Sequence, residues 1–195
     1  MPSLPAAVEL LRELSQVLLE RRIPWYLFGA QAVALYGLPR MTGDVDVTVE
    51  IAPGQSKALV AALEGSGFEL RVKDVDDFVA RTRVLPFLHL STGLPLDVVL
   101  AGSGLEEDFL RRVREIDAGG VRVPVISPED LIIAKILAGR PKDIADVQGI
   151  LHARGEEIDR GRVREVLHLL EKALGQSDLL ASFEAAGGEI ERRRL

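Results

Sequence analysis

Residues 29–49 read GAQAVALYGLPRMTGDVDVTV, and this stretch decides the fold class that the sequence predicts. The apolar residues 25–28 before it predict a buried strand that runs into a glycine turn. The alanine-rich residues 30–36 predict a short helix, which Gly37 ends because glycine commonly closes helices. A polar loop follows, and then a second strand over residues 44–51 that begins with two carboxylates. The sequence therefore places a glycine turn, a helix start and two acids within one short stretch.

Asp44 and Asp46 are the first candidates for chemistry. They lie two residues apart in a predicted strand, so both face the same side of the sheet. A separation of about 7 Å along the strand suits Mg²⁺, which prefers carboxylate oxygens. The alternative is two solvated acids at the start of a strand.

The turn before the carboxylates predicts a phosphate site. Gly29 and Ala30 stand at the predicted helix start, where backbone N–H groups without helical partners suit a phosphate. The alternative for Gly29 is an ordinary tight turn. Arg40 and Thr42 come just before the carboxylates, and Arg40 is a candidate clamp for a nucleotide phosphate or, alternatively, half of a surface ion pair. Together with the two carboxylates, these residues predict metal-dependent phosphoryl or nucleotidyl transfer.

A site with two metal ions usually needs a third carboxylate from elsewhere in the chain, and Asp97 is the best candidate. It interrupts the apolar residues 94–100, where an uncompensated charge costs several kcal/mol. The alternative is an acid at an exposed strand edge. Asp74, Asp76 and Asp77 are the other candidates, but their polar segment reads as a solvated loop.

Four charged residues in the C-terminal half are further candidates for nucleotide binding. Lys135 lies in a strongly apolar predicted helix over residues 127–138, so its charge has to reach a cleft or solvent. Lys142, Asp143 and Asp146 follow at the start of the next predicted helix. The alternative is that the acids complement the helix dipole and that Lys142 pairs with Asp146 at i,i+4.

The order of predicted elements divides the chain into a mixed α/β half, residues 1–126, and an all-helical half, residues 127–195. Besides the elements named above, the patterns of apolar residues and turn residues predict three helices and four strands in the first half. The helices are expected over 5–22, 55–65 and 105–113, and the strands over 68–73, 84–90, 96–100 and 121–126. In the second half, helices are expected over 128–138, 141–155 and 159–174.

Composition narrows the class of protein. The chain has 195 residues, 47% of them hydrophobic, which is enough for a sizeable core, and no cysteine for disulfides or thiolate metal sites. The net charge of −6 argues against general electrostatic binding of nucleic acid. Without a signal-peptide layout or an apolar run of about 20 residues, a cytoplasmic protein with no membrane partner is expected. The scattered histidines are interpreted as structural, and no nucleophilic serine motif, Walker loop or dinucleotide fingerprint is present.

Two runs of residues resemble a known family. The run from Gly29-Ala30-x-Ala32 to Asp44-x-Asp46 resembles motif I of the DNA polymerase β-like nucleotidyltransferase superfamily. The run from Asp130-Leu131 through Lys135 to Asp146 resembles the C-terminal motif of its minimal bacterial branch, which includes the AbiEii and MenT-type toxins. The resemblance covers roughly residues 23–155 and implies an α+β fold, with a mixed β-sheet flanked by helices and a C-terminal helical bundle packed on this core.

The resemblance also implies roles for the candidate residues. Asp44, Asp46 and Asp97 would bind two Mg²⁺ ions, and Asp97 would help to deprotonate the acceptor hydroxyl. Gly29 and the helix after it would hold the triphosphate, Lys135 would neutralise its charge, and Asp143 and Asp146 would shape the nucleotide pocket. Many relatives have serine or glycine where this chain has Ala30, so a hydroxyl contact to phosphate is missing here.

The predicted function is Mg²⁺-dependent transfer of a nucleoside monophosphate from an NTP such as ATP to an acceptor hydroxyl, with release of pyrophosphate. The acceptor is tRNA, a protein side chain or a small molecule such as an antibiotic, and a toxin with a cognate antitoxin protein is one form of this function. Two alternatives stay open. One is a toxin-like or adaptor module with weak catalysis, and the other is a metal-dependent phosphohydrolase that uses the same three acids.

Overall fold

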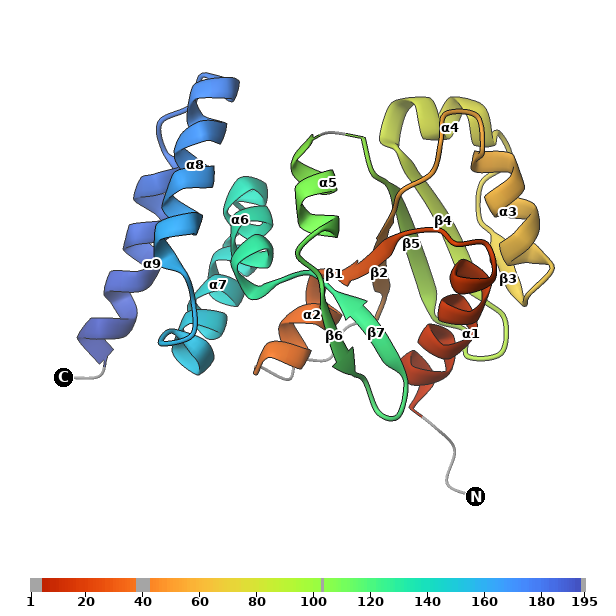
Figure 1. Cartoon of the computed structure of the whole chain (residues 1–195), viewed down its shortest axis with the longest axis horizontal. Coiled ribbons are helices and arrows are strands. Elements are labelled where there is room, and N and C mark those ends of the chain that lie inside the picture. Colours follow the sequence, from red (N-terminus) through yellow and green to blue (C-terminus); the bar gives the residue numbers. More distant parts are fainter. Residues whose placement is uncertain (1–4, 38–42, 103, 194–195) are drawn as a thin grey trace. The chain divides into compact units, whose positions relative to one another are not determined.

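The computed structural model describes residues 5–37, 43–102 and 104–193, and the strands within them form one mixed sheet (Figure 1). The strand order is β3-β4-β5-β2-β1-β7-β6. Strands β2 and β5 pair in parallel, as do β1 and β7, whereas the other neighbours are antiparallel. In chain order the strands are β1 (Trp25–Phe28), β2 (Val45–Val49), β3 (Phe68–Leu70), β4 (Val84–His89), β5 (Pro95–Leu100), β6 (Arg114–Asp117) and β7 (Arg122–Val125).

Burial along the strands explains the sheet order. In β2, every residue except Asp46 is buried, as expected for a central strand. In β4 and β5, buried residues alternate with half-buried ones, so one face of this hairpin packs in the core. The α+β class predicted from the sequence is confirmed, with mixed strand directions and helices both between and after the strands.

The described elements belong to two compact units. Unit 1 comprises Met1–Gln31 and Met41–Ile126 and holds the sheet with α1 (Ala6–Glu20), α3 (Ser56–Glu64), α4 (Val75–Thr82) and α5 (Gly104–Leu110). Unit 2 comprises Ala32–Arg40 and Ser127–Leu195. Apart from residues 32–40, the two units meet in the chain between residues 126 and 127. Helix α2 (Gly29–Tyr36) thus begins in unit 1 and continues in unit 2.

Unit 2 is built from the end of α2 and the helices α6 (Pro128–Ala138), α7 (Pro141–Arg154), α8 (Arg160–Leu174) and α9 (Leu179–Arg193). Helix α6 packs against α7 and α8, and α9 packs against α7 and α8. The predicted start of α6 is confirmed, because the Ser127 hydroxyl accepts a hydrogen bond from the Asp130 N–H and Pro128 occupies the first turn. Gly139 ends this helix in the left-handed conformation, at φ +64°.

Three local interpretations of the sequence need correction. The segment interpreted as a solvated loop contains α4, which Asp74 caps by accepting a hydrogen bond from the Asp77 N–H. Its acids are first-turn residues that complement the helix dipole, rather than signs of a loop. Strand β6 was not expected, because this mostly exposed edge strand has only one apolar residue, Ile116. Helix α9 lies beyond residues 159–174, the last helix range expected from the sequence.

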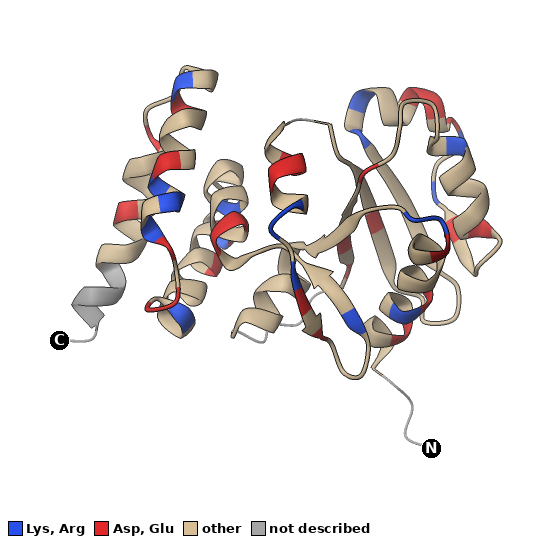
Figure 2. Cartoon of the chain, in the orientation of Figure 1, with Lys and Arg blue, Asp and Glu red and all other residues tan. Residues whose placement is uncertain are grey.

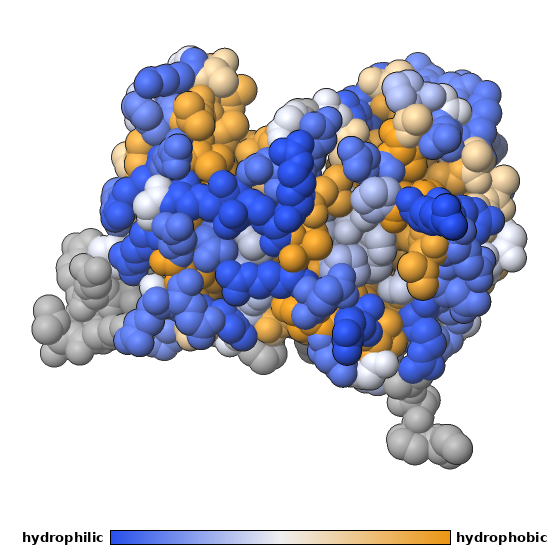
Figure 3. Space-filling view, in the orientation of Figure 1, coloured by the Kyte–Doolittle hydropathy of each residue, from blue (hydrophilic) through white to orange (hydrophobic). Residues whose placement is uncertain are grey.

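The surface carries interspersed charges and small apolar areas. Lys and Arg residues are interspersed with Asp and Glu residues along the elements of both units (Figure 2), in keeping with the net charge of −6. Hydrophilic residues cover most of the face drawn in Figure 3. Of the helices in the described residues, none combines the length and apolar character that a membrane span requires.

Candidate active site

Asp46 and Asp97 are partners in the ladder between the parallel strands β2 and β5. Neighbouring strands lie about 4.8 Å apart, and paired positions point to the same face of a sheet. Both side chains are half-buried. The structure therefore brings together two of the three carboxylates that the sequence nominated as metal ligands.

Asp44 lies directly before β2 and is exposed, and its charge acts on Asp97. Burial raises the pKa of the Asp97 carboxyl above its ordinary value, and the negative charge of Asp44 raises this pKa further, while Arg71 partly opposes the shift. Burial and a like charge both disfavour the ionised form of an acid. A cation placed here would favour that form, so the electrostatics fit a metal site.

Gly29 fits against the carboxylate of Asp46 because it has no side chain. A Cβ at position 29 would lie 2.8 Å from Cγ and 2.9 Å from Cβ of Asp46, and it would overlap Oδ2 of the same carboxylate. The backbone of Gly29 is also left-handed, at φ +67°, where other residues are strained. Gly29 follows Phe28, the β1 partner of Asp46, so the sheet itself brings the start of α2 to this acid.

The donor chemistry of this cluster fits Mg²⁺, since carboxylate oxygens are its preferred protein ligands. Asp46 and Asp97 share one patch of the sheet, and Asp44 is close enough to shift the pKa of Asp97. Among the described residues, no three acidic or histidine side chains are already grouped as a metal-binding set. The cluster is thus a pair of neighbouring acids with a third acid nearby, which would have to draw together around an ion.

The remaining candidates from the first 126 residues are placed as follows. Ala30 is buried in the first turn of α2. Arg40 and Thr42 lie outside the described residues. Of the alternative acids, which are all exposed, Asp76 pairs with Lys57 at 2.6 Å and Asp77 with Arg81 at 2.6 Å, while Asp74 caps α4.

In unit 2, Lys135 forms a buried ionic cluster with Asp143 and Asp146. Its Nζ donates hydrogen bonds to Oδ1 of Asp143 at 3.0 Å and to Oδ2 of Asp146 at 2.8 Å. Only 7% of the surface of Lys135 is exposed and none of Asp143. Arg140 adds a second cation, because its Nε and Nη2 both donate to the Asp143 carboxylate. The structure thus brings together three predicted residues, with the lysine bonded to the two acids.

The charges of this cluster are closely matched. Burial alone would raise the pKa of Asp143, but the hydrogen bonds and positive charges of Arg140 and Lys135 outweigh burial and lower this pKa. Asp143 is therefore held in its ionised form. Lys142, the fourth candidate, is exposed in the first turn of α7, and the Lys142–Asp146 pair that was weighed as an alternative is replaced by the Lys135–Asp146 pair.

Sequence reasoning missed two contacts that order unit 2. Arg162 Nη2 donates to Oδ1 of buried Asp130 at 2.8 Å, across 32 positions of the chain. Arg154 Nε donates to the backbone carbonyl of Tyr36 at 2.9 Å, and its guanidinium lies over the tyrosine ring, 5.6 Å from the centroid. The only signal in the sequence is an acid at the start of an apolar helix, which does not reveal its partner.

A mixed sheet with helices inserted between its strands and paired acids beside a glycine-started helix is the architecture of a nucleotidyltransferase. The chain belongs to the family described as nucleotidyltransferase of unknown function (DUF6036), whose model matches residues 4–174. The predicted enzyme class, a nucleotidyltransferase, is thereby confirmed. No protein with a curated description matches the chain.

Solved structures show the same fold at low sequence identity. An antigenic nucleotidyltransferase-like protein from Paracoccidioides brasiliensis is 17% identical, with 91% of each chain covered and a TM-score of 0.54. The solution structure of the antibiotic-resistance factor ANT(2″)-Ia is 16% identical, with 96% of each chain covered and a TM-score of 0.56. ANT(2″)-Ia in complex with adenylyl-2″-tobramycin is 17% identical, covers 98% of this chain and 100% of its own, and has a TM-score of 0.50.

Proposed function

We propose that this nucleotidyltransferase moves a nucleoside monophosphate from an NTP to an acceptor hydroxyl and releases pyrophosphate. The observation that carries the proposal is the pairing of Asp46 with Asp97 in the sheet. Asp46 also lies directly against Gly29, where a side chain would not fit. Acids on one face of a sheet, next to a helix start, combine metal ligands with backbone N–H groups that suit a phosphate.

Asp44, Asp46 and Asp97 are the residues that would hold Mg²⁺, which when bound neutralises charge on the triphosphate and on the departing pyrophosphate. The first turn of α2 orients the phosphates through its backbone N–H groups. Ala30 offers no hydroxyl, so its contribution is limited to the backbone. Arg40 and Thr42 are proposed as additional phosphate contacts.

Asp97, the β5 partner of Asp46, is the proposed proton acceptor, since a general base has to lie within hydrogen-bond reach of the hydroxyl that it deprotonates. The acceptor oxygen forms a bond to the α-phosphorus while the bond from this phosphorus to the bridging oxygen of the pyrophosphate breaks. The hydroxyl proton passes to Asp97, and the bond electrons leave with the pyrophosphate.

For unit 2, we propose that Lys135, Asp143 and Asp146 shape the nucleotide pocket as one ionic cluster. A triphosphate that recruits Lys135 has to compete with two carboxylates for the same Nζ. Exposed Lys142, one residue before Asp143, is the cation that meets a phosphate without such competition.

A small hydroxyl-bearing molecule is the first acceptor to test, because one structural relative holds an adenylylated aminoglycoside, adenylyl-2″-tobramycin. A tRNA and a protein side chain are the other two candidates. Membership of the AbiEii and MenT-type branch rests on the two sequence motifs. It adds the proposals of a toxin, a cognate antitoxin and a cytoplasmic location.

Incubation with each α-labelled NTP, Mg²⁺ and either tobramycin, tRNA or a cell extract tests the proposal. The expected result is label on one acceptor with wild type and none with Asp46→Asn, while Glu69→Gln, an exposed acid on β3, behaves as wild type. Release of phosphate without a labelled acceptor would instead establish the phosphohydrolase. Binding of Mg·NTP without either reaction would establish the binding module.

A further inference from the structure

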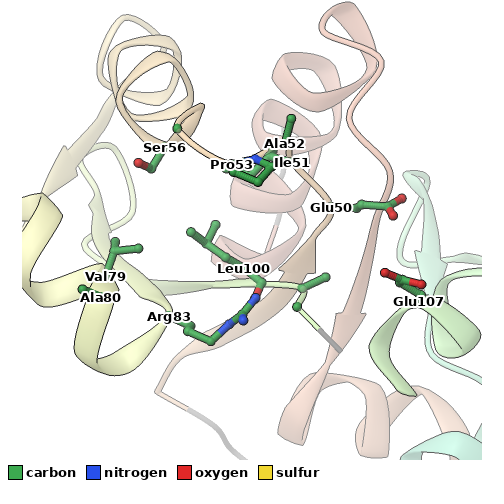
Figure 4. A pocket seen from close by; sticks show the side chains of 13 residues that line it. Glu50, Ile51, Ala52, Pro53, Ser56, Val79, Ala80, Arg83, Leu100 and Glu107 are labelled. Atoms are coloured by element: carbon green, nitrogen blue, oxygen red, sulfur yellow. The ribbon is translucent and has the colours of Figure 1, made fainter. Parts of the chain in front are cut away.

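A cavity in unit 1 lies away from the paired carboxylates. It has a volume of about 590 Å³ and is formed at the carboxyl ends of β2 and β5, by the loop after β2, the end of α4 and the start of α5 (Figure 4). Glu50, which follows β2, is four residues beyond Asp46, or about 13 Å along an extended chain. The pocket and the candidate active site therefore occupy opposite ends of the same two strands.

The topology of the sheet explains why a pocket forms here. From β2 the chain continues through α3 to β3 at one edge of the sheet, whereas from β5 it continues through α5 to β6 at the other edge. The pocket thus lies where the chain leaves β2 and β5 for opposite edges, at the carboxyl ends of two parallel strands, and ligands in open α/β sheets bind at such ends. The volume is also within the range of small-molecule pockets, about 300–1,000 Å³.

A fixed guanidinium stands at the floor of this pocket. Arg83 closes α4 in the left-handed conformation, at φ +57°, and its Nε and Nη2 both donate to the Leu100 carbonyl, at 3.1 and 2.7 Å. A Cβ on Gly102 would overlap this guanidinium, so the absence of a side chain there gives Arg83 its place. The Arg83 guanidinium is thus held by hydrogen bonds to a backbone carbonyl. Among the described residues, it is the single cation that lines the pocket.

The pocket is lined by two acids, which outnumber the single cation Arg83. Glu50 and Glu107 both line the pocket, and Figure 4 shows their carboxylates on the same side of it. Within the described ranges, the Glu50 side chain makes no hydrogen bond or ion pair with the protein, and Glu107 has only a 3.8 Å contact with exposed Arg111. Glu106 lies next to them and accepts a hydrogen bond from the Gly102 N–H. The acidic end therefore favours a positive ligand group.

Apolar side chains form much of the remaining wall. Ile51 and Pro53 from the loop after β2, Val79 from α4 and Leu100 at the end of β5 all line the cavity. Such a wall buries an apolar ligand body, while a few charged groups fix its orientation. We propose that this pocket binds a small organic amine, with its ammonium group between Glu50 and Glu107 and its apolar body against these side chains. The site is separate from the proposed nucleotide site and does not depend on it.

Amide chemical shifts of the full-length, ¹⁵N-labelled protein test the proposal with 2-phenylethylamine as the probe and 2-phenylethanol as its uncharged match. The amine is expected to shift amides of residues 50–54 and 100–102, and the alcohol to bind more weakly. Glu50→Gln and Glu107→Gln should each weaken binding of the amine roughly fivefold, the effect of one partly exposed charge. Glu69→Gln serves as the matched control and should change nothing.

Ala80→Trp places a large side chain at an exposed lining position on α4 and should abolish the shifts, while the remaining spectrum reports that the protein is folded. Equal affinity for amine and alcohol, shifts confined to other residues, an unchanged affinity in both glutamine variants, or no binding at all would each overturn the proposal. None of these readouts uses nucleotide transfer, so the result is independent of the proposed enzymatic activity.

Discussion

Gly29→Ala should destabilise unit 1 more than an ordinary glycine substitution, because a side chain at position 29 is disfavoured both by the backbone conformation and by the contact with Asp46. The left-handed backbone at φ +67° costs a residue with a Cβ about 1–2 kcal/mol. The new methyl group would also stand 2.8 Å from Cγ of Asp46 and overlap Oδ2, so the carboxylate has to move, at a typical overpacking cost of about 1–3 kcal/mol. We expect a total loss of about 2–5 kcal/mol in the free energy of unfolding.

Urea unfolding followed by the fluorescence of Trp25, the chain's single tryptophan, measures this loss. Trp25 is 8% exposed and lies on β1, the strand that ends directly before Gly29, so its emission reports on the relevant part of the sheet. Gly93→Ala is the matched control, since Gly93 has φ +70° but open space where a Cβ would stand. It should show the backbone cost alone, about 1–2 kcal/mol.

A double variant separates the collision from the backbone cost. In Gly29→Ala/Asp46→Gly, the new methyl group meets neither the carboxylate nor the Cβ of residue 46, which would stand 2.9 Å away. The loss relative to Asp46→Gly should therefore shrink toward that of Gly93→Ala, with a coupling energy of about 1–3 kcal/mol. If Gly29→Ala costs no more than Gly93→Ala, or if removal of the Asp46 side chain brings no relief, the described packing of Gly29 against Asp46 is refuted.

Three further predictions concern the charged clusters. Asp46→Asn should abolish transfer yet leave the free energy of unfolding in EDTA within about 1 kcal/mol of wild type or higher, because one like charge is removed; a larger loss would mark Asp46 as structural. Asp97 has a raised pKa in the folded protein, so protonation of this acid stabilises the fold. This stabilisation is fully present below pH 3.8 and is lost as pH rises through the folded-state pKa. Metal-free Asp97→Asn should therefore exceed wild type in stability at neutral pH, and this advantage should vanish in acid; pH-independent differences would contradict the shift. Asp143 has a lowered pKa, so its ionised form stabilises the fold. This contribution to stability is present above pH 3.8 and is lost as pH falls through the folded-state pKa. Asp143→Asn should cost about 3–5 kcal/mol at pH 7, because buried Lys135 loses a partner, and exposed Lys142→Met should cost less than about 0.5 kcal/mol; equal costs would show that the ionic cluster contributes nothing.

Local signals in the sequence were sufficient for most of the fold. The patterns of apolar and turn residues predicted β4, β5 and α6, whose observed bounds lie within one residue of the expected ranges. Strand β6 could not be predicted in this way, because its exposed residues lack the apolar alternation that marks a half-buried strand. The acids at the start of α4 were misread because acidic residues suit both a solvated loop and a helix N-terminus.

The sequence indicates which residues belong to the candidate site, but not which of these residues contact one another. A lysine within an apolar helix indicates that its charge needs compensation, but this pattern does not distinguish a bound phosphate from two aspartates on the following helix. The aspartates lie 8 and 11 positions away, and only the packing of α6 against α7 brings them to Nζ. The left-handed conformation of Gly29 is likewise compatible with the sequence, but its contact with Asp46 depends on the β1–β2 ladder.

The core of the sheet also fixes the position of Asp97 in the site. Leu96, Val98 and Leu100 alternate with Asp97 along β5 and are buried on the opposite face. A slip of one residue in the pairing with β2 would turn Asp97 into the core and the three apolar side chains out of it. Exposing those side chains alone would cost roughly 5–9 kcal/mol, at about 1.5–3 kcal/mol each. Since this is comparable to the whole stability of a typical domain, the apolar residues of β5 determine that Asp97 stands beside Asp46.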